Sequence, residues 1–176
     1  MIWFYEAAGA IRDFMELGGN VLWAIMGVLF LMWTFILERL WYFYRVYPGR
    51  KRAVVAQWER RADTSSWYAR RIREGMVSEV ALELKQNIGL IKLLIAICPL
   101  LGLLGTVTGM IEVFEVMAIS GSGNPRSMAS GVSKATVPTM AGMVAALSGV
   151  AMSAYLENKA RREREFIADE LTVEHG

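Results

Sequence analysis

Hydroxyl side chains inside apolar stretches are the groups of this chain best suited to handling protons. Thr106 lies in the stretch 93–111 and Thr139 in the stretch 135–156, and neither stretch contains an acidic residue. A hydroxyl group donates and accepts hydrogen bonds without changing its own charge near neutral pH. Any carboxylate that titrates at this level would have to come from elsewhere, such as a partner helix that carries Asp or Glu.

The two threonines also match in depth if their stretches cross a membrane in opposite directions. Thr106 lies six residues before Glu112, and Thr139 lies five residues after Lys134. At about 1.5 Å per residue, both hydroxyls reach a similar level. The spacing predicts that Thr106 and Thr139 line a polar pore in one layer. The alternative is that such hydroxyls bond to carbonyls of their own helix.

Three charged residues stand near the ends of these stretches. Glu112 and Glu115 follow the stretch that contains Thr106, and Lys134 precedes the stretch that contains Thr139. Two roles stay open for Lys134. It either extends outward as an interfacial anchor or forms an ion pair with Glu112 or Glu115.

The elements that position these residues are three long apolar segments, at 18–37, 93–111 and 135–156. Each can span a bilayer core of about 30 Å as a helix. A buried helix in a soluble core is the alternative, but uncharged core helices of this length are uncommon. With 55% hydrophobic residues, the sequence predicts an all-α membrane protein with three transmembrane helices.

Small residues recur on one face of the second and third segments and predict close helix packing. We therefore expect spans two and three to mediate self-assembly. Pro99 and Pro138 each remove a backbone hydrogen bond, and we expect kinks there. The small-residue positions are Gly102, Gly105, Gly109, Ala135, Gly142, Ala146 and Gly149.

The basic residues predict the orientation of the chain. Of the 19 Lys and Arg residues, twelve fall in 38–92 and four in 157–176. Since positive segments stay cytoplasmic, residues 38–92 form a cytoplasmic helical region and 157–176 a cytoplasmic helical tail. Residues 1–17 form an external N-terminal segment, and 112–134 a short periplasmic loop.

The composition argues against several other classes of protein. Cys98 is the single cysteine and His175 the single histidine, so we expect neither an intrachain disulfide nor a metal site. The glycines at 102–109 lack the lysine of a phosphate-binding loop. We expect no enzyme activity and no cofactor. The basic run at 50–52 follows a span and favours contact with the lipid bilayer over nucleic acid.

Two motifs resemble the MotA/TolQ/ExbB proton-channel family. They are GlyLeuLeuGlyThrValThrGlyMet at 102–110 and AlaSerGlyValSerLysAlaThrValProThrMetAlaGlyMetValAlaAla at 129–146. The nearest branch is ExbB of TonB systems, most similar to its secondary-system paralogues. The resemblance extends over essentially the whole chain.

This resemblance implies a ring-forming homopentamer in the bacterial inner membrane. The ring encloses an ExbD-like single-span protein whose membrane aspartate carries protons, and proton flow drives a TonB-like protein. Outer-membrane uptake of iron-siderophore type substrates is the implied output. Thr106 and Thr139 match the pore threonines of the family. Lys134 stands where better-known ExbB and TolQ proteins carry glutamate, which leaves its role in proton transfer open.

Other functions stay open on the sequence alone. A TolQ-like or MotA-like motor subunit differs from the ExbB reading in its partner proteins. A non-conducting membrane scaffold, which clusters partners through the basic region, is the alternative of another class. A scaffold tolerates loss of the two pore hydroxyls, whereas a proton-driven motor does not.

Overall fold

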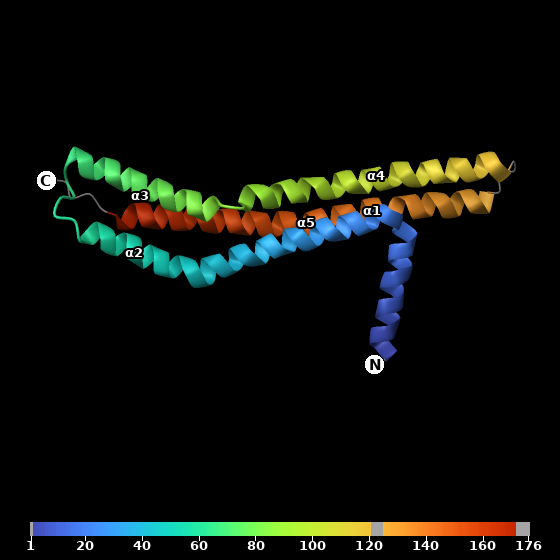
Figure 1. Ribbon diagram of the computed structural model, residues 1–176, viewed down its shortest axis with the longest axis horizontal. Coiled ribbons are helices and arrows are strands. Elements are labelled where there is room, and N and C mark those ends of the chain that lie inside the picture. Colours follow the sequence, from blue (N-terminus) through green and yellow to red (C-terminus); the bar gives the residue numbers. More distant parts are fainter. Residues whose placement is uncertain (1, 121–124, 172–176) are drawn as a thin grey trace. The chain divides into compact units, whose positions relative to one another are not determined.

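The computed structural model describes residues 2–120 and 125–171, and every secondary-structure element in these ranges is helical (Figure 1). This confirms the all-α fold for the described part of the chain. In order, the elements are α1 (Ile2–Trp41), the π-helix η1 (Tyr42–Val46), α2 (Tyr47–Glu59), α3 (Trp67–Lys85), α4 (Ile88–Ser120) and α5 (Pro125–Glu170).

Three helical stretches are long and apolar enough to cross a membrane: Gly19–Glu59, Trp67–Ile119 and Gly131–Glu170. They contain the predicted segments at 93–111 and 135–156 and all but the first residue of 18–37. Within one chain, only 22% to 33% of their most apolar windows is buried. The remaining apolar surface requires lipid or other chains to cover it, as expected of a membrane protein.

The segment between the second and third predicted spans is largely helical. Helix α4 continues to Ser120 and α5 begins at Pro125, so helix occupies most of the segment 112–134. Proline suits this position because its fixed φ is already helical and its missing N–H would be unpaired there in any case. Residues 121–124 of that segment, and 172–176 of the predicted tail, lie outside the described residues.

The segment 1–17, expected outside the membrane, is helical from Ile2 and belongs to α1. At Gly19 the backbone leaves the helical conformation, with φ 59° and ψ −157°. Glycine takes this conformation at low cost because it has no Cβ. Gly19 therefore separates an N-terminal helical piece from the first candidate span.

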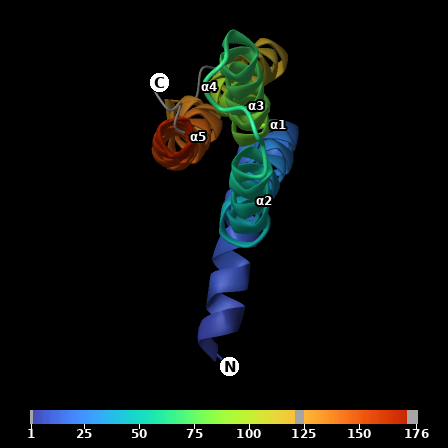
Figure 2. The ribbon, with the colours of Figure 1, turned by 90° about the vertical axis from the view of Figure 1, so that its left-hand side faces the viewer.

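The chain divides into two compact units. Residues 1–33 and 93–150 form the first, and residues 34–92 and 151–176 form the second. In the second unit, α2, α3 and the C-terminal part of α5 lie side by side, and Figure 2 shows them end on. Its buried apolar side chains include Val54, Trp58, Val80, Leu84, Leu156, Ala160 and Ile167.

The turn between α2 and α3 contains a helix cap, with Ser66 as the N-cap of α3. The Ser66 hydroxyl accepts a hydrogen bond from the Ala69 N–H at 3.2 Å, and the Asp63 carboxylate accepts one from the Ser66 N–H at 3.0 Å. Ser66 Oγ also donates to Asp63 Oδ2, and these bonds lower the pKa of the Asp63 carboxyl. The cap fixes where α3 begins.

A polar cluster joins the end of α1 to the end of α3. Arg39 is 1% exposed and donates a hydrogen bond from Nη2 to the backbone carbonyl of Glu83. The Tyr42 hydroxyl and the Arg50 guanidinium donate to the Glu83 carboxylate at 3.2 Å and 2.8 Å. The last carbonyls of a helix have no partner within that helix. The Glu83 carbonyl also accepts from the Gln86 N–H at 3.3 Å, so Arg39 adds a second donor to a carbonyl in the last turn of α3.

We expect Arg39→Met to lower the free energy of unfolding by about 1–3 kcal/mol, since hydrogen bonds from charged groups contribute in this range. Methionine keeps the length of the side chain and removes its donors. Thermal unfolding in detergent measures the effect. Arg45→Met is the matched control because Arg45 is exposed and makes no ion pair within the described residues. Equal unfolding midpoints for the two variants would contradict the role given to Arg39.

Candidate functional site

The site is built on a close contact between α4 and α5 in the first unit. A Cβ at Gly102 would lie 2.9 Å from both the Pro138 carbonyl oxygen and the Thr139 Cα. A Cβ at Gly109 would lie 2.8 Å from the Ala135 Cβ. Both distances are shorter than normal carbon contacts. Glycine is therefore what allows the two helix backbones to approach.

The small residues of α5 serve the same purpose. A Cβ at Gly142 would meet the backbone carbonyl of Cys98. One at Gly149 would lie 2.5 Å from Met32 Sδ of α1 and 2.6 Å from Ile95 Cγ1 of α4. Ala135 and Ala146 are buried as well. The small-residue face that predicted assembly between chains therefore packs helices within one chain.

Pro99 lies inside α4 and Pro138 lies inside α5, and each helix continues past its proline. The Pro138 ring faces Gly105, where an added Cβ would lie 2.8 Å from its Cγ. Proline removes one N–H donor and adds bulk on the same face. Glycine opposite that bulk lets α4 pass the ring without separating from α5.

Thr139 forms a hydrogen bond between the two helices. Its Oγ1 donates to the backbone carbonyl of Gly102 at 2.9 Å, and the side chain is half-buried. This contact is possible only because Gly102 has no side chain. The Gly102 position thus places the Thr139 hydroxyl directly on the backbone of α4.

Thr106 is also half-buried, but its hydroxyl donates to the Leu103 carbonyl of its own helix at 2.7 Å. Thr139 bonds to Gly102, one turn from Thr106 along α4, but its neighbour Pro138 faces Gly105, which is next to Thr106. The two hydroxyls therefore lie within about one turn, or 5.4 Å, of each other along α4. Counting from charged residues outside the spans could not fix the register, which the glycine contacts determine.

Thr136 is a second α5 hydroxyl near the level of Thr106. Gly109 faces Ala135 and Gly105 faces Pro138, so the register puts Thr136 between these two contacts. Its side chain is exposed, and its hydroxyl donates to the Ser133 carbonyl at 2.8 Å. Sequence reasoning did not select Thr136. Pairing the small residues of the two segments could have found it.

The hydroxyls are arranged to interact with either form of a carboxyl group. Each of the three threonines donates its proton to a backbone carbonyl, so its oxygen lone pairs stay available as acceptors. A protonated carboxylic acid can donate to such an oxygen. An ionised carboxylate needs a donor, which requires the hydroxyl to turn away from its carbonyl. The site can therefore respond to the protonation state of a nearby acid.

Lys134, Glu112 and Glu115 are all exposed, and no salt bridge joins Lys134 to either glutamate in the described part of the chain. The ion pair considered from the sequence does not form within one chain. An interfacial anchor, or a pair between chains, remains compatible with these positions. Over residues 2–120 and 125–171, no group of three or more His, Cys, Asp or Glu residues could hold a metal ion.

A family profile described as the MotA/TolQ/ExbB proton channel family matches residues 49–168, which is more than half of the chain and includes the whole α4–α5 contact. The chain belongs to this family. The MotA/TolQ/ExbB match begins after the first predicted span and covers both segments that carry the threonines.

Two curated relatives support the same assignment. The chain is 37% identical over 82 residues to biopolymer transport protein ExbB-like 1 of Synechocystis, an alignment that covers 45% of this chain and 32% of the relative. It is 43% identical over 70 residues to biopolymer transport protein exbB1 of Vibrio cholerae, covering 39% of this chain and 31% of the relative. The alignments thus span about a third of these relatives' lengths. No solved structure matches the chain.

Proposed function

We propose that this chain is an ExbB-like subunit of an inner-membrane motor driven by the proton-motive force. In this proposal it is not an enzyme, and it energises TonB-dependent uptake of iron-siderophore type substrates across the outer membrane. The observation that carries the proposal is the hydroxyl site at the α4–α5 contact in a proton-channel family member. That site lies in segments that contain no acidic residue of their own.

The missing acid supports a partner that supplies it. We propose a homopentamer that encloses an ExbD-like single-span helix bearing a membrane aspartate, with a TonB-like protein as the output. Exposed apolar side chains in the first unit, such as Trp23 at 64% and Leu147 at 68% exposure, offer surface for both lipid and subunit contacts. In this proposal the subunits contact one another through these exposed faces, because the glycines pack helices within the chain.

The proposed proton step uses the two states of the threonine hydroxyls. A protonated partner aspartate donates to the oxygen of Thr106 or Thr139. After the proton leaves, the carboxylate accepts from the same hydroxyl, which must release its carbonyl. For Thr139 this carbonyl belongs to Gly102 at 2.9 Å. Loss or gain of the proton thereby changes a contact between α4 and α5.

The orientation in this proposal follows the basic residues. Twelve of the 19 Lys and Arg residues lie in 38–92, which supports a cytoplasmic position for that region and for the tail. The N-terminus is then periplasmic. The second unit is then a cytoplasmic helical bundle.

Copurification followed by mass measurement tests the assembly. The chain is expressed with a neighbouring single-span protein that carries a membrane aspartate, and native mass spectrometry counts the subunits. We expect five copies of this chain with the partner bound. A monomer that does not retain the partner would contradict the proposed ring.

Proton flux separates a motor from a scaffold. Liposomes that contain the complex should acidify in response to a proton gradient only when the partner aspartate is present. Absence of any partner-dependent flux would favour the non-conducting scaffold. A TolQ-like or MotA-like role would instead appear as flux with a different output protein, which the neighbouring genes indicate.

We expect Lys134→Gln to reduce transport by less than about twofold, because exposed charges at a membrane boundary contribute little individually. The measurement is siderophore uptake by cells in which this chain is the only copy of the subunit. A loss greater than about tenfold, corresponding to about 1.4 kcal/mol, would contradict the anchor role. Recovery in a Lys134→Glu, Glu112→Lys double variant would then identify an ion pair between chains.

A further inference from the structure

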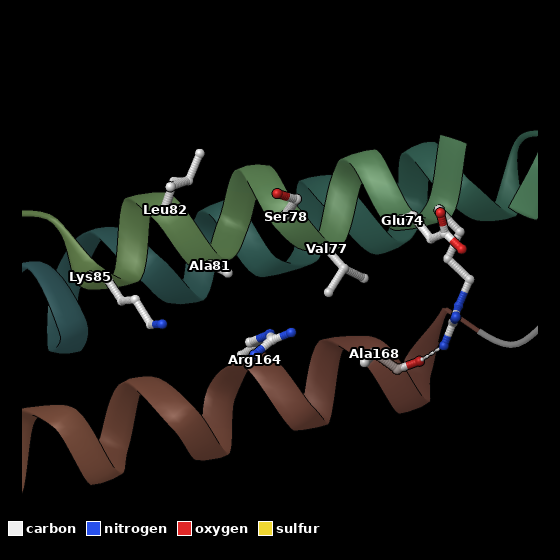
Figure 3. A pocket seen from close by; sticks show the side chains of 9 residues that line it. Glu74, Val77, Ser78, Ala81, Leu82, Lys85, Arg164 and Ala168 are labelled. Atoms are coloured by element: carbon white, nitrogen blue, oxygen red, sulfur yellow. Dashed lines mark hydrogen bonds between the residues drawn. The ribbon is translucent and has the colours of Figure 1, made fainter. Parts of the chain in front are cut away.

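A groove lies between α3 and the C-terminal part of α5, wholly within the second unit (Figure 3). Its volume is about 440 Å³. Lys85 and Ala81 of α3 point toward Arg164 of α5 across this space. We call this space the α3–α5 groove. The lining residues are Arg73, Glu74, Val77, Ser78, Ala81, Leu82, Lys85, Arg164 and Ala168.

The groove carries cations without matching anions. Neither Lys85 nor Arg164 forms a salt bridge with any residue in the described part of the chain. The one lining carboxylate, Glu74, pairs with Arg71 at 3.0 Å. Arg73 donates to the backbone carbonyls of Leu171 and Ala168. Two cationic side chains therefore face one space without a counter-charge from this chain.

The lysine between α2 and α5, by contrast, is paired within the chain. There, Lys51 lies 3.6 Å from the Glu163 carboxylate and 3.3 Å from the centre of the Phe166 ring. Lys51 is therefore paired within the chain, whereas Lys85 and Arg164 form no salt bridge within the described residues. Lys85 and Arg164 are both exposed, so water screens their repulsion, and an anion between them would attract both.

We propose that the α3–α5 groove binds an acidic peptide segment of a partner protein. Carboxylates of the peptide lie between Lys85 and Arg164, and its apolar side chains contact Val77, Ala81 and Ala168. The site is separate from the proposed proton path, since it uses other residues and another ligand.

The shape favours a peptide over a lipid headgroup. The lining residues of α3 run from Arg73 to Lys85, a length of about 18 Å at 1.5 Å per residue. A single headgroup fills only part of that length. Val77, Ala81 and Ala168 add apolar surface between the charged ends, which suits alternating acidic and apolar side chains.

Fluorescence anisotropy with the full chain in neutral detergent tests the proposal. The probe is a labelled helical peptide of about 14 residues with Glu on one face and Leu on the other, and the comparison peptide has Gln for Glu. We expect the Glu peptide to bind at least about tenfold more tightly. We expect Lys85→Glu with Arg164→Glu to remove this preference. Raising NaCl from about 0.05 M to 0.5 M should weaken binding.

Arg60→Glu with Arg162→Glu is the matched control, because both residues are exposed and neither lines the groove. It makes the same change in net charge and should leave peptide binding within about twofold. Equal binding of the Glu and Gln peptides would overturn the proposal. So would an equal loss in the control variant, which would indicate a general charge effect.

Lipid binding is tested with the same variant. The native chain and the Lys85→Glu, Arg164→Glu variant are placed in nanodiscs of phosphatidylcholine with or without phosphatidylglycerol. We expect the variant to retain phosphatidylglycerol as well as the native chain does. Selective loss of that lipid by the variant, without any preference for the Glu peptide, would replace the peptide proposal with a lipid site.

Discussion

Gly142→Leu is expected to prevent stable folding of the first unit. An added Cβ at this position meets the Cys98 carbonyl, and the next contact is the Gly102 Cα at 3.4 Å. Both neighbours are backbone atoms, so no side chain can move aside. Overpacking costs about 1–3 kcal/mol even where side chains can adjust. We therefore expect a loss of at least about 3 kcal/mol for leucine here.

Size-exclusion chromatography and thermal unfolding in detergent measure this effect. Gly27→Leu is the matched control, because Gly27 is an exposed glycine of α1 in the same unit with nothing within 4 Å of an added Cβ. We expect the control to unfold near the native midpoint and the Gly142 variant to aggregate. A native-like Gly142→Leu monomer that fails only to form a ring would show that the glycine face packs between chains instead.

The double variant Thr106→Val, Thr139→Val is expected to lose most TonB-dependent uptake while still binding its partner, and this expectation depends on the proposed function. Valine keeps the shape of threonine and removes the hydroxyl. Hydrogen bonds to an ionised group contribute about 1.5–3 kcal/mol. Their loss should shift the proton equilibrium of the partner carboxyl by about ten- to a hundredfold.

Siderophore transport and the yield of the copurified complex are measured together. Thr108→Val is the matched control, since Thr108 lies two residues after Thr106 and so on nearly the opposite side of α4, with its hydroxyl bonded to carbonyls of its own helix at 3.0 Å and 3.1 Å. Wild-type transport in the double variant would overturn the proton-path role of these threonines. A fall in complex yield equal to the fall in transport would identify a packing role only.

Thr139 needs one further variant, because its bond to Gly102 also holds α4 against α5. Removing such a bond costs about 0.5–1.5 kcal/mol of stability. Thr139→Ser keeps the hydroxyl and deletes one methyl group. We expect serine to support transport and valine not to. Equal losses in both variants would point to the methyl group and to packing.

The register between α4 and α5 could not be read from the sequence. The helical period puts Gly102, Gly105 and Gly109 near one face, but that period permits the neighbouring helix to slide by a turn. Contacts between the glycines and the backbone of the opposing helix fixed the register of α5 against α4. As a result Thr139 lies against Gly102, and both Thr136 and Thr139 lie within about one turn of Thr106.

The charged clusters likewise could not be predicted from any one segment of the sequence. Arg39 follows the first span by two residues, and nothing near it in sequence indicated that it would be buried against Glu83. Lys85 and Arg164 are 79 residues apart in the chain, yet they face one groove. Both arrangements depend on which helices become neighbours, and no pattern along a single helix contains that information.

The sequence by itself determined the properties that depend on one segment at a time. The three apolar stretches, the small-residue faces and the family motifs were readable because length, hydrophobicity and helical period are local. Only the tertiary structure decided how those faces are used. It placed the glycines between helices of one chain because their missing Cβ atoms allow backbone contact, and that contact sets the level of every hydroxyl in the candidate site.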